Sequence, residues 1–347
     1  MKKGLNMNRG IEMNKVVTFK AVNNTSNFRR TALKCGSAFS GVGAFEQALK
    51  NLGIYHVNMF AIENDQFAKK TYMANHKVRQ FYDDIQSVNP YELPDVDCYM
   101  WSSPGKAFSS NGLRNGMSDK SAKLFYDGLY IVNVKKPKFF IFENVAGMLT
   151  NKTVISDVSG YFQSLSDYRL FYQILNTKEF GSALNSERLV VVGVRNDVKI
   201  DPLFIKTSSM KSINDFITKE TNYFDVMYDA LLVEKVVSNK RSDMKQIGFF
   251  PHIRYLSDRF IYASSGIAPC FRTKNRHHFY DEINGIYRYL TLDEMARIQG
   301  FEDFIFPVSK TQTIKQIANA TNINLLEALL ETLLSDYLPK PLSLRVA

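Results

Sequence analysis

Between Lys34 and about residue 200, short apolar runs alternate with amphipathic segments. The apolar runs are typical of buried strands, and they cover residues 35–41, 56–63, 97–102, 138–145 and 188–195. The segments 44–53 and 64–76 carry apolar residues at helical spacing, and the first of them ends at Gly53. This rhythm predicts a doubly wound, Rossmann-like α/β fold with a parallel sheet.

The pattern changes after about residue 201. Residues 201–285 mix short segments with Lys, Ser, Asn and Tyr, and helical spacing returns at 291–300 and 313–338. We therefore expect a large domain made of residues 34–200 and 286–347, with a smaller domain inserted at 201–285. Residues 1–33 show little periodicity, which predicts a basic flexible leader; a basic arm on nucleic acid is the alternative.

Composition narrows the class of protein. Apolar residues make up 45% of the chain and aromatic residues 13%, which excludes a largely disordered chain. No run of about 18 apolar residues and no secretory signal is present, so we expect a cytoplasmic protein without a membrane span. The net charge of +10 makes a polyanionic partner plausible. Seven basic residues against one acid fall within residues 1–30.

A first candidate site is the turn Gly41-x-Gly43 between a strand and a helix. Such a turn brings the backbone and the helix N-terminus close to a ligand, although a tight turn without a ligand explains two glycines as well. Glu63 ends the next strand, where nucleotide folds place an acid on ribose hydroxyls, and Asp84 follows the next helix. Together they favour an adenosyl cofactor; a surface ion pair is the alternative for Asp84.

A second candidate is Glu143, which ends the buried strand 138–145. Ligands of open α/β sheets bind at the carboxyl ends of the strands. Partly apolar surroundings there would raise the pKa of this carboxyl, and it could then protonate or hydrogen-bond a ring nitrogen of a base. A buried Glu that caps the following turn is the equal alternative.

The order of these segments resembles the DNA (cytosine-5) methyltransferase family from about Lys34 to Leu334. The similar segments are FSGVGAFEQAL, AIEND, DDIQSV, ENVAGML, LNSERLVVVGVRND, RYLTLDEMARIQGF and KQIANA. Each is weak alone, and their shared order is the signal.

The resemblance implies an S-adenosylmethionine-binding α/β domain, with S-adenosylhomocysteine as the product, and a target-recognition domain over 201–285. It also implies double-stranded DNA as partner, and a cytosine flipped into the pocket. In this family a cysteine attacks C6 and the glutamate holds N3 and the amino group while C5 takes the methyl group. The implied cofactor residues are Phe39, Gly41, Gly43, Glu63, Asp84, Ile85 and Asn319; the implied catalytic residues are Glu143, Asn144 and Arg188.

The family's nucleophilic cysteine is missing. Its position is Gly105, after Pro104, and Cys35, Cys98 and Cys270 are expected to be small core residues. The sequence therefore predicts little or no methyl transfer, through either an engineered or a natural loss. Further departures from the family pattern are Leu184, Ser186, Ser121 and Ala318.

Basic and polar side chains near the expected cleft are the candidates for DNA contacts. They are Lys106, Ser109, Arg114, Lys120, Lys123, Arg272, Lys274 and Arg276. No metal site is expected. The first hypothesis is a silenced DNA methyltransferase, acting as a monomer. The second is a non-catalytic DNA-binding homologue or one subunit of a two-chain methyltransferase, and the third is an RNA cytosine methyltransferase.

Overall fold

The computed structural model describes residues 32–104, 120–150, 152–200, 209–218, 234–235, 243–249, 260–273 and 276–338. Most of the expected leader 1–33 lies outside these residues, and so do Gly105, Lys106, Ser109, Arg114 and Lys274. Within the described residues, no helix is long and apolar enough to cross a membrane.

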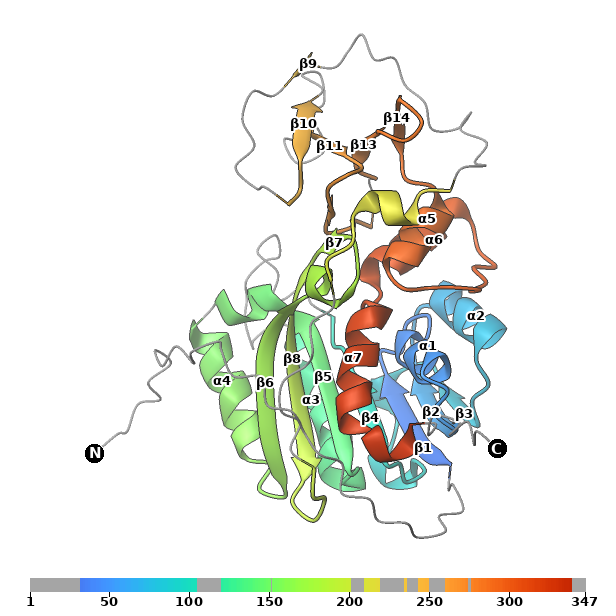
Figure 1. The fold of residues 1–347 in the computed structure, drawn as a ribbon. Coiled ribbons are helices and arrows are strands. Elements are labelled where there is room, and N and C mark those ends of the chain that lie inside the picture. The colour runs from blue at the N-terminus through green and yellow to red at the C-terminus, as the bar shows by residue number, and fades with distance from the viewer. Residues whose placement is uncertain are drawn as a thin grey trace, which may run out of the picture. The chain divides into compact units, whose positions relative to one another are not determined.

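A seven-stranded sheet forms the centre of the fold, in the order β3-β2-β1-β4-β5-β8-β6 (Figure 1). Its strands are β1 (Leu33–Ala38), β2 (His56–Ile62), β3 (Gln80–Tyr82), β4 (Cys98–Trp101), β5 (Phe139–Val145), β6 (Tyr168–Asn176) and β8 (Glu187–Arg195). The chain reverses its winding between β1 and β4, so the doubly wound prediction is confirmed.

The expectation of an all-parallel sheet was wrong at one strand. β8 runs antiparallel to both β5 and β6, whereas the other neighbouring pairs of this sheet are parallel. The connection from β6 to β8 covers only residues 177–186. A parallel crossover needs about a dozen residues or more, so the chain can only turn back.

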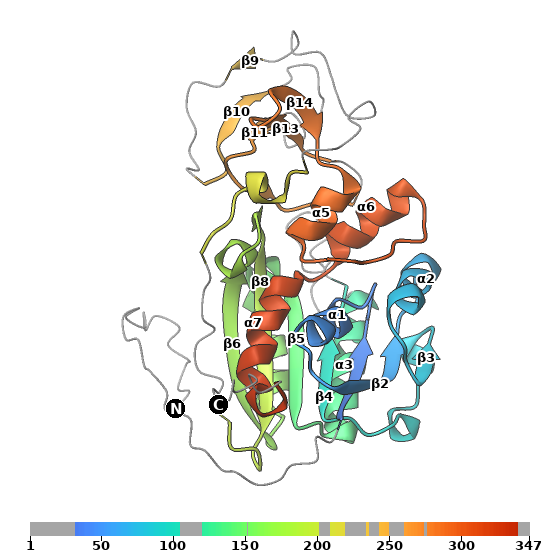
Figure 2. The same ribbon diagram turned by 45° about the vertical axis from the view of Figure 1, so that its right-hand side comes forward.

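Helices cover both faces of the sheet (Figures 1 and 2). The buried apolar residues of α1 (Ala44–Asn51) and α7 (Ile323–Leu333) belong to one apolar cluster, together with residues of α5 (Leu292–Ile298) and α6 (Lys310–Asn319). Those of α3 (Lys120–Lys135) and α4 (Lys152–Gln163) belong to a second cluster on the other face. Helix α2 (Gln66–Asn75) begins at Asp65, whose side chain caps it.

A second, five-stranded sheet has the order β14-β13-β11-β10-β9. Its strands are β9 (Glu234–Lys235), β10 (Gln246–Phe249), β11 (Phe260–Ala263), β13 (His278–Asp281) and β14 (Ile286–Tyr289). Arg288 of β14 is buried and pairs with Asp281 of β13 at 2.8 Å and with Glu294 of α5 at 2.7 Å. These ion pairs fix the hairpin formed by β13 and β14 to α5. The sheet continues beyond the expected domain junction at 286, and the domain division itself stays a prediction.

A short parallel strand pair joins the residues just before β8 to the segment between β11 and β13 of the second sheet. It consists of β7 (Leu184–Asn185) and β12 (Ala268–Pro269).

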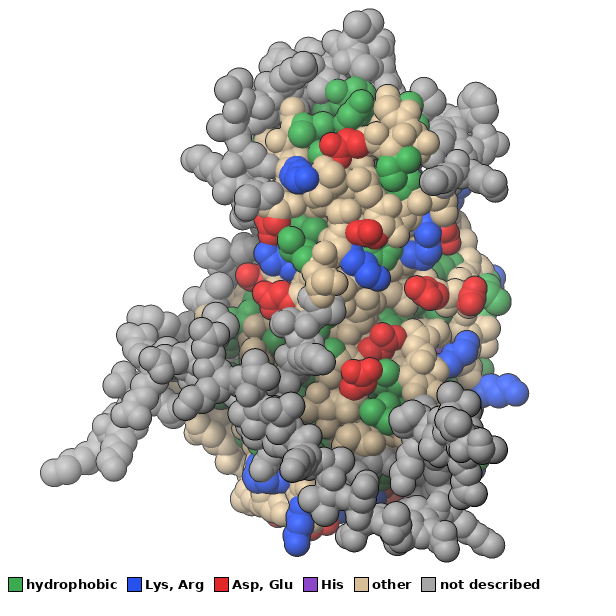
Figure 3. Space-filling model, viewed as in Figure 1, with side chains coloured by type: hydrophobic (Ala, Val, Ile, Leu, Met, Phe, Trp, Pro, Cys, Tyr) green, Lys and Arg blue, Asp and Glu red, His purple; other side chains and the backbone are tan. Residues whose placement is uncertain are grey.

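On the face shown in Figure 3, the acidic and basic side chains of the described residues are intermingled. Charge on that face therefore does not single out a surface for a polyanion.

Candidate active site

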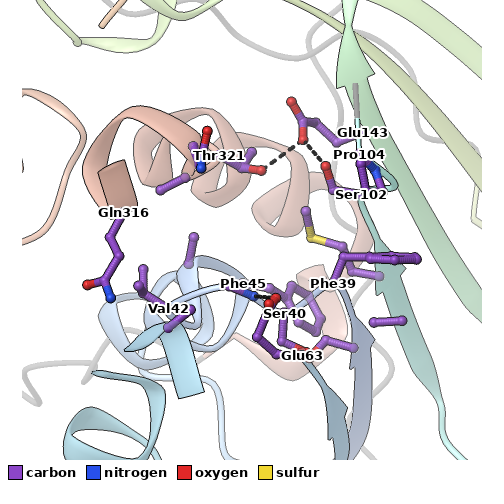
Figure 4. A pocket seen from close by; sticks show the side chains of 18 of the residues that line it. Phe39, Ser40, Val42, Phe45, Glu63, Ser102, Pro104, Glu143, Gln316 and Thr321 are labelled. Atoms are coloured by element: carbon purple, nitrogen blue, oxygen red, sulfur yellow. Dashed lines mark hydrogen bonds between the residues drawn. The ribbon is translucent and has the colours of Figure 1, made fainter. Parts of the chain in front are cut away.

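A cavity of about 520 Å³ opens at the carboxyl ends of β1, β2, β4 and β5 (Figure 4). The residues that follow these strands line one part of it, and residues 315–321, at the end of α6 and just after it, line another. The carboxyl ends of neighbouring parallel strands share one edge of a sheet, which is why segments far apart in sequence meet here. Phe39, Gly41, Glu63, Glu143, Asn144, Arg188 and Asn319 all line this cavity.

The glycine turn between β1 and α1 needs glycine at two positions. Gly41 and Gly43 have φ values of 56° and 89°, a region that disfavours residues with a Cβ. A Cβ on Gly43 would lie 2.3 Å from Cδ2 of His76, whereas one on Gly41 would meet nothing within 4 Å. The space beside Gly41 is therefore open to a ligand.

Glu63, which follows the neighbouring strand β2, is hydrogen-bonded to the glycine turn. One carboxylate oxygen accepts the Gly41 amide at 2.9 Å, and the other accepts the Asp65 amide at 2.8 Å. Burial raises the pKa of Glu63, and these two backbone donors oppose that rise. Each oxygen keeps a lone pair that can accept a hydroxyl group of a ligand.

Glu143 is held in the cavity by three side-chain donors. Its Oε2 accepts the Ser102 hydroxyl at 2.8 Å and the Thr321 hydroxyl at 2.9 Å (Figure 4). Arg188 Nε lies 3.0 Å from Oε1, and the side chain of Glu143 is only 5% exposed. Three donors thus surround this carboxyl, in place of the partly apolar surroundings that the sequence suggested.

Asn144 points to the segment that follows β4. Its Nδ2 donates to the Ser103 carbonyl at 3.0 Å, and its Oδ1 accepts the Val145 amide at 2.9 Å. The side chain therefore fixes the backbone just before Pro104, which precedes Gly105 in the sequence.

A polar network that the sequence did not reveal lies beneath the glycine turn. Glu46 of α1 is 1% exposed and accepts hydrogen bonds from Ser37 at 2.6 Å and from Tyr72 at 3.1 Å. Ser37 is also hydrogen-bonded to Ser40 at 2.7 Å. Burial raises the pKa of Glu46. The network joins β1, the turn, α1 and α2 into one unit.

Three of the expected cofactor residues, Gly43, Asp84 and Ile85, do not line the cavity. Asp84 is exposed and accepts the Gln86 amide at 3.0 Å, which caps a short 3₁₀ turn. Ile85 is buried in the apolar cluster below α3.

The described DNA candidates differ in their surroundings. Lys123 and Arg272 are exposed, whereas Arg276 stacks 4.6 Å from the ring centre of Tyr289 and donates to the Leu290 carbonyl. For Lys120 the structure describes only its place in α3.

The expectation for Cys270 was wrong: this cysteine is exposed, 3.4 Å from the Ser186 hydroxyl, because the short β12 strand ends just before it. Cys35 and Cys98 are buried as expected.

Three residues that line the cavity were not predicted from the sequence although a signal was present. Ser102 stands two positions before Pro104, and Thr321 stands two positions after Asn319, both beside segments that resemble the family. Lys315, which lines the cavity and pairs with Asp65 at 2.6 Å, stands next to Gln316 of the last motif. Their hydroxyl and ammonium groups stand beside motif residues in the sequence, and this position could have indicated Ser102, Lys315 and Thr321.

Fold and cavity together define an α/β methyltransferase. The crystal structure of the S. pombe Dnmt2 methyltransferase superposes with a TM-score of 0.67, at 18% identity, covering 88% of this chain and 99% of that one. The similarity at this identity shows the shared fold.

The chain belongs to the C-5 cytosine-specific DNA methylase family, whose profile matches residues 33–335. The Type II methyltransferase M.SsoII of Shigella sonnei is 29% identical over 346 residues, covering 94% of this chain and 86% of that protein. The Type II methyltransferase M.FnuDI of Fusobacterium nucleatum is 28% identical over 328 residues, covering 84% and 92%.

S-adenosylmethionine is the methyl donor of this family, and the cavity fits it. Its volume lies in the usual range for small-molecule sites, about 300–1,000 Å³. The open space beside Gly41 and the acceptor oxygens of Glu63 provide a close backbone approach and a partner for hydroxyl groups.

Proposed function

We propose that this chain binds double-stranded DNA and S-adenosylmethionine, and accepts a flipped cytosine beside Glu143. We further propose that Gly105 leaves it with little or no methyl transfer. The observation that carries the proposal is the set of donors around Glu143, contributed by the ends of β4 and β8 and the segment after α6. An acid fixed in this way can hold the edge of a base in a defined orientation.

The cofactor side of the proposal rests on the residues around the glycine turn. Phe39, Gly41, Glu63 and Asn319 would hold S-adenosylmethionine, and Gly43 would shape the turn. The bound cofactor supplies an electrophilic methyl group. Asp84 and Ile85 stay predictions that rest on the family resemblance alone.

The proposed loss of activity rests on the residue after Pro104. Pro104 lines the cavity, and the next residue in the sequence is glycine, which offers no nucleophile. The cavity lining contains no cysteine among the residues that the structure describes. Burial raises the thiol pKa of Cys35 and Cys98, which keeps both thiols protonated and unreactive. A missing covalent step removes the activation of C5.

The decisive experiment restores the nucleophile. Gly105→Cys is assayed with methyl-labelled S-adenosylmethionine and duplex DNA of mixed sequence, beside the parent chain and Gly105→Ser as a matched control. We expect methyl transfer with the cysteine variant alone. A variant that binds cofactor and DNA yet transfers no methyl group would contradict the proposal.

The second sheet and its flanking residues are our proposal for the target-recognition region, expected over 201–285. Lys106, Ser109, Arg114, Lys120, Lys123, Arg272, Lys274 and Arg276 are the proposed DNA contacts. Each phosphate contact contributes to the salt dependence of affinity. Arg272→Gln should therefore reduce the slope of log K against log salt by about one.

One observation favours a second function, a non-catalytic DNA-binding homologue or subunit. Leu184 and Ser186, which stand where the family carries site residues, are buried at 1% and 2% exposure. The Ser186 hydroxyl contacts Cys270 in place of the cavity. If this function is correct, Gly105→Cys stays inactive by itself and gains activity only with a partner chain.

A further inference from the structure

A chain of hydrogen bonds runs along the active-site cavity from the glycine turn to α6. The amides of Gly41 and Asp65 donate to the two carboxylate oxygens of Glu63, at 2.9 Å and 2.8 Å. Lys315 Nζ donates to Oδ2 of Asp65 at 2.6 Å. All four residues line the cavity, so Lys315 is connected through Asp65 to the acid that faces the space beside Gly41.

The carboxylate of Asp65 is held at the cavity by the helix that it caps. Its Oδ1 accepts the amides of Phe67 at 2.9 Å and Ala68 at 3.2 Å, at the start of α2. The chain thus keeps two acids, Glu63 and Asp65, in one cavity lining. Two carboxylates that share a site disfavour each other's ionised form. Lys315 binds the oxygen of Asp65 that the helix leaves free, and it compensates one of the two charges.

The pKa shifts of the two acids agree with this arrangement. Burial raises the pKa of Glu63, the amides of Asp65 and Gly41 oppose the rise, and the Asp65 carboxylate adds to it. Burial also opposes ionisation of Asp65, but the Lys315 ammonium and the amides of α2 outweigh it, so the pKa of Asp65 lies below its usual value. Without Lys315, the charge of Asp65 would act on Glu63 uncompensated.

The other charged groups on the elements around Glu63 have partners of their own. The Glu63 amide donates to the Tyr82 carbonyl at 3.0 Å, so the end of β3 packs beside it. The groups are Glu46 of α1, Lys69 of α2, and Asp83 and Asp84 after β3. Lys69 and Asp83 pair with each other at 2.6 Å, and Glu46 and Asp84 accept other hydrogen bonds. Within the described residues, Lys315 is the cation paired with Asp65.

The position of α6 does not depend on this ion pair. The Thr71 hydroxyl of α2 donates to Oε1 of Gln316 at 2.9 Å, and both residues are buried. Thr321, just after α6, is bonded to Glu143. Removal of the Lys315 charge should therefore leave the cavity wall in place and change its electrostatics.

We propose that Lys315 is a positioning residue for the cofactor, which compensates the charge of Asp65 and so keeps Glu63 ionised as the acceptor of the cofactor's hydroxyl groups. The inference rests on the role proposed above for Glu63. Hydrogen bonds to an ionised acceptor are about twice as strong as those to a neutral one, so a Glu63 that takes up a proton holds the cofactor less tightly.

The test is calorimetry of S-adenosylhomocysteine binding between pH 8 and pH 5.5. Lys315→Met should bind as tightly as the parent at pH 8 and about threefold to tenfold more weakly at pH 5.5, since a rise of one pKa unit changes affinity up to tenfold below both pKa values. Lys315→Arg keeps the charge and should follow the parent. Lys315→Met combined with Asp65→Asn removes both charges and should restore the parent profile.

Lys69→Met is the matched control, because it breaks an ion pair of the same length, 2.6 Å, whose residues do not line the cavity. Its pH profile should equal that of the parent. A loss of affinity in Lys315→Met that is the same at every pH, or that Asp65→Asn does not restore, overturns the proposal and indicates direct contact of Lys315 with the ligand. A parent-like profile in Lys315→Met overturns it as well.

A second measurement needs no cofactor. In the ligand-free chain, the carboxyl ¹³C NMR signal of Glu63, assigned with Glu63→Gln, should titrate at higher pH in Lys315→Met and return to the parent midpoint in the double variant. An unmoved midpoint overturns the proposal. If Glu63→Ala binds S-adenosylhomocysteine as tightly as the parent, the proposed role of Glu63 fails, and the NMR midpoint still decides whether Lys315 acts on Glu63.

Discussion

The Thr321 hydroxyl donates a 2.9 Å hydrogen bond to Oε2 of Glu143, across 178 positions of sequence. Both residues are buried, at 7% and 4% exposure. Ser102 donates to the same oxygen, so the two hydroxyl groups fill both of its lone pairs, whereas Oε1, which lies 3.0 Å from Arg188 Nε, keeps one lone pair. The position of the acid is thus set by the last motif of the chain as much as by its own strand.

Thr321→Val keeps the shape of the side chain and removes this donor. We expect a loss of about 1 kcal/mol in the free energy of unfolding, the usual net value of one buried hydrogen bond. Urea denaturation measures the loss. Thr332→Val is the control: its hydroxyl bonds only to the Ala328 carbonyl of its own helix, so its effect should be smaller. Equal effects in the two variants would speak against a special role of Thr321.

The ion pair between Arg188 and Glu143 is nearly buried, with side-chain exposures of 12% and 5%. Arg188→Met leaves the carboxylate without its cation, which for buried pairs costs about 3–5 kcal/mol. Arg195→Met breaks a pair in which Asp197 is 63% exposed and should cost less than about 1 kcal/mol of pairing energy. Thermal or urea denaturation compares the two. A similar small loss in both would mean that water reaches Glu143.

His76 should make the fold sensitive to acid. Burial, reinforced by Lys50, lowers its pKa to about 4, whereas an unfolded chain takes up the proton near 6.5. Between these values the unfolded state binds more protons, so stability is full above pH 6.5 and falls as the pH drops toward 4, by up to about 3 kcal/mol. Urea denaturation of the parent chain and His76→Gln, in phosphate-free buffers at pH 5 and pH 7, tests this. The variant should lose less stability between the two pH values, and an unchanged difference would refute the assignment.

Glu63 should contribute directly to cofactor affinity. Glu63→Ala removes the acceptor for ligand hydroxyl groups and also releases the amides of Gly41 and Asp65. We expect S-adenosylhomocysteine to bind about 10–100-fold more weakly, as for the loss of a hydrogen bond to a charged group. Calorimetry is the measurement, with Asp167→Ala as control, since Asp167 pairs with Lys136 and does not line the cavity. Unchanged affinity in Glu63→Ala would place the ligand elsewhere.

Periodicity anticipated most strands of the large sheet and the helices α1, α2, α5, α6 and α7, because each carries apolar residues at the expected spacing. It missed β3, which has only three residues, and β6, whose pattern is broken by the exposed Tyr172 and Ile174 at the sheet edge. It also gave no direction for β8. An apolar run reads the same for a parallel and an antiparallel strand, and only the short 177–186 connection decides.

The sequence by itself determined the family, the glycine turn, and the acids Glu63 and Glu143 at the ends of their strands. These features depend on residue type and order along the chain. Tertiary structure alone decided that Ser102, Arg188 and Thr321 meet on one carboxylate, and that Ser37 and Tyr72 meet on the buried Glu46. Such contacts join residues separated by tens to hundreds of positions, and a sequence pattern carries no information on which distant side chains share a buried space.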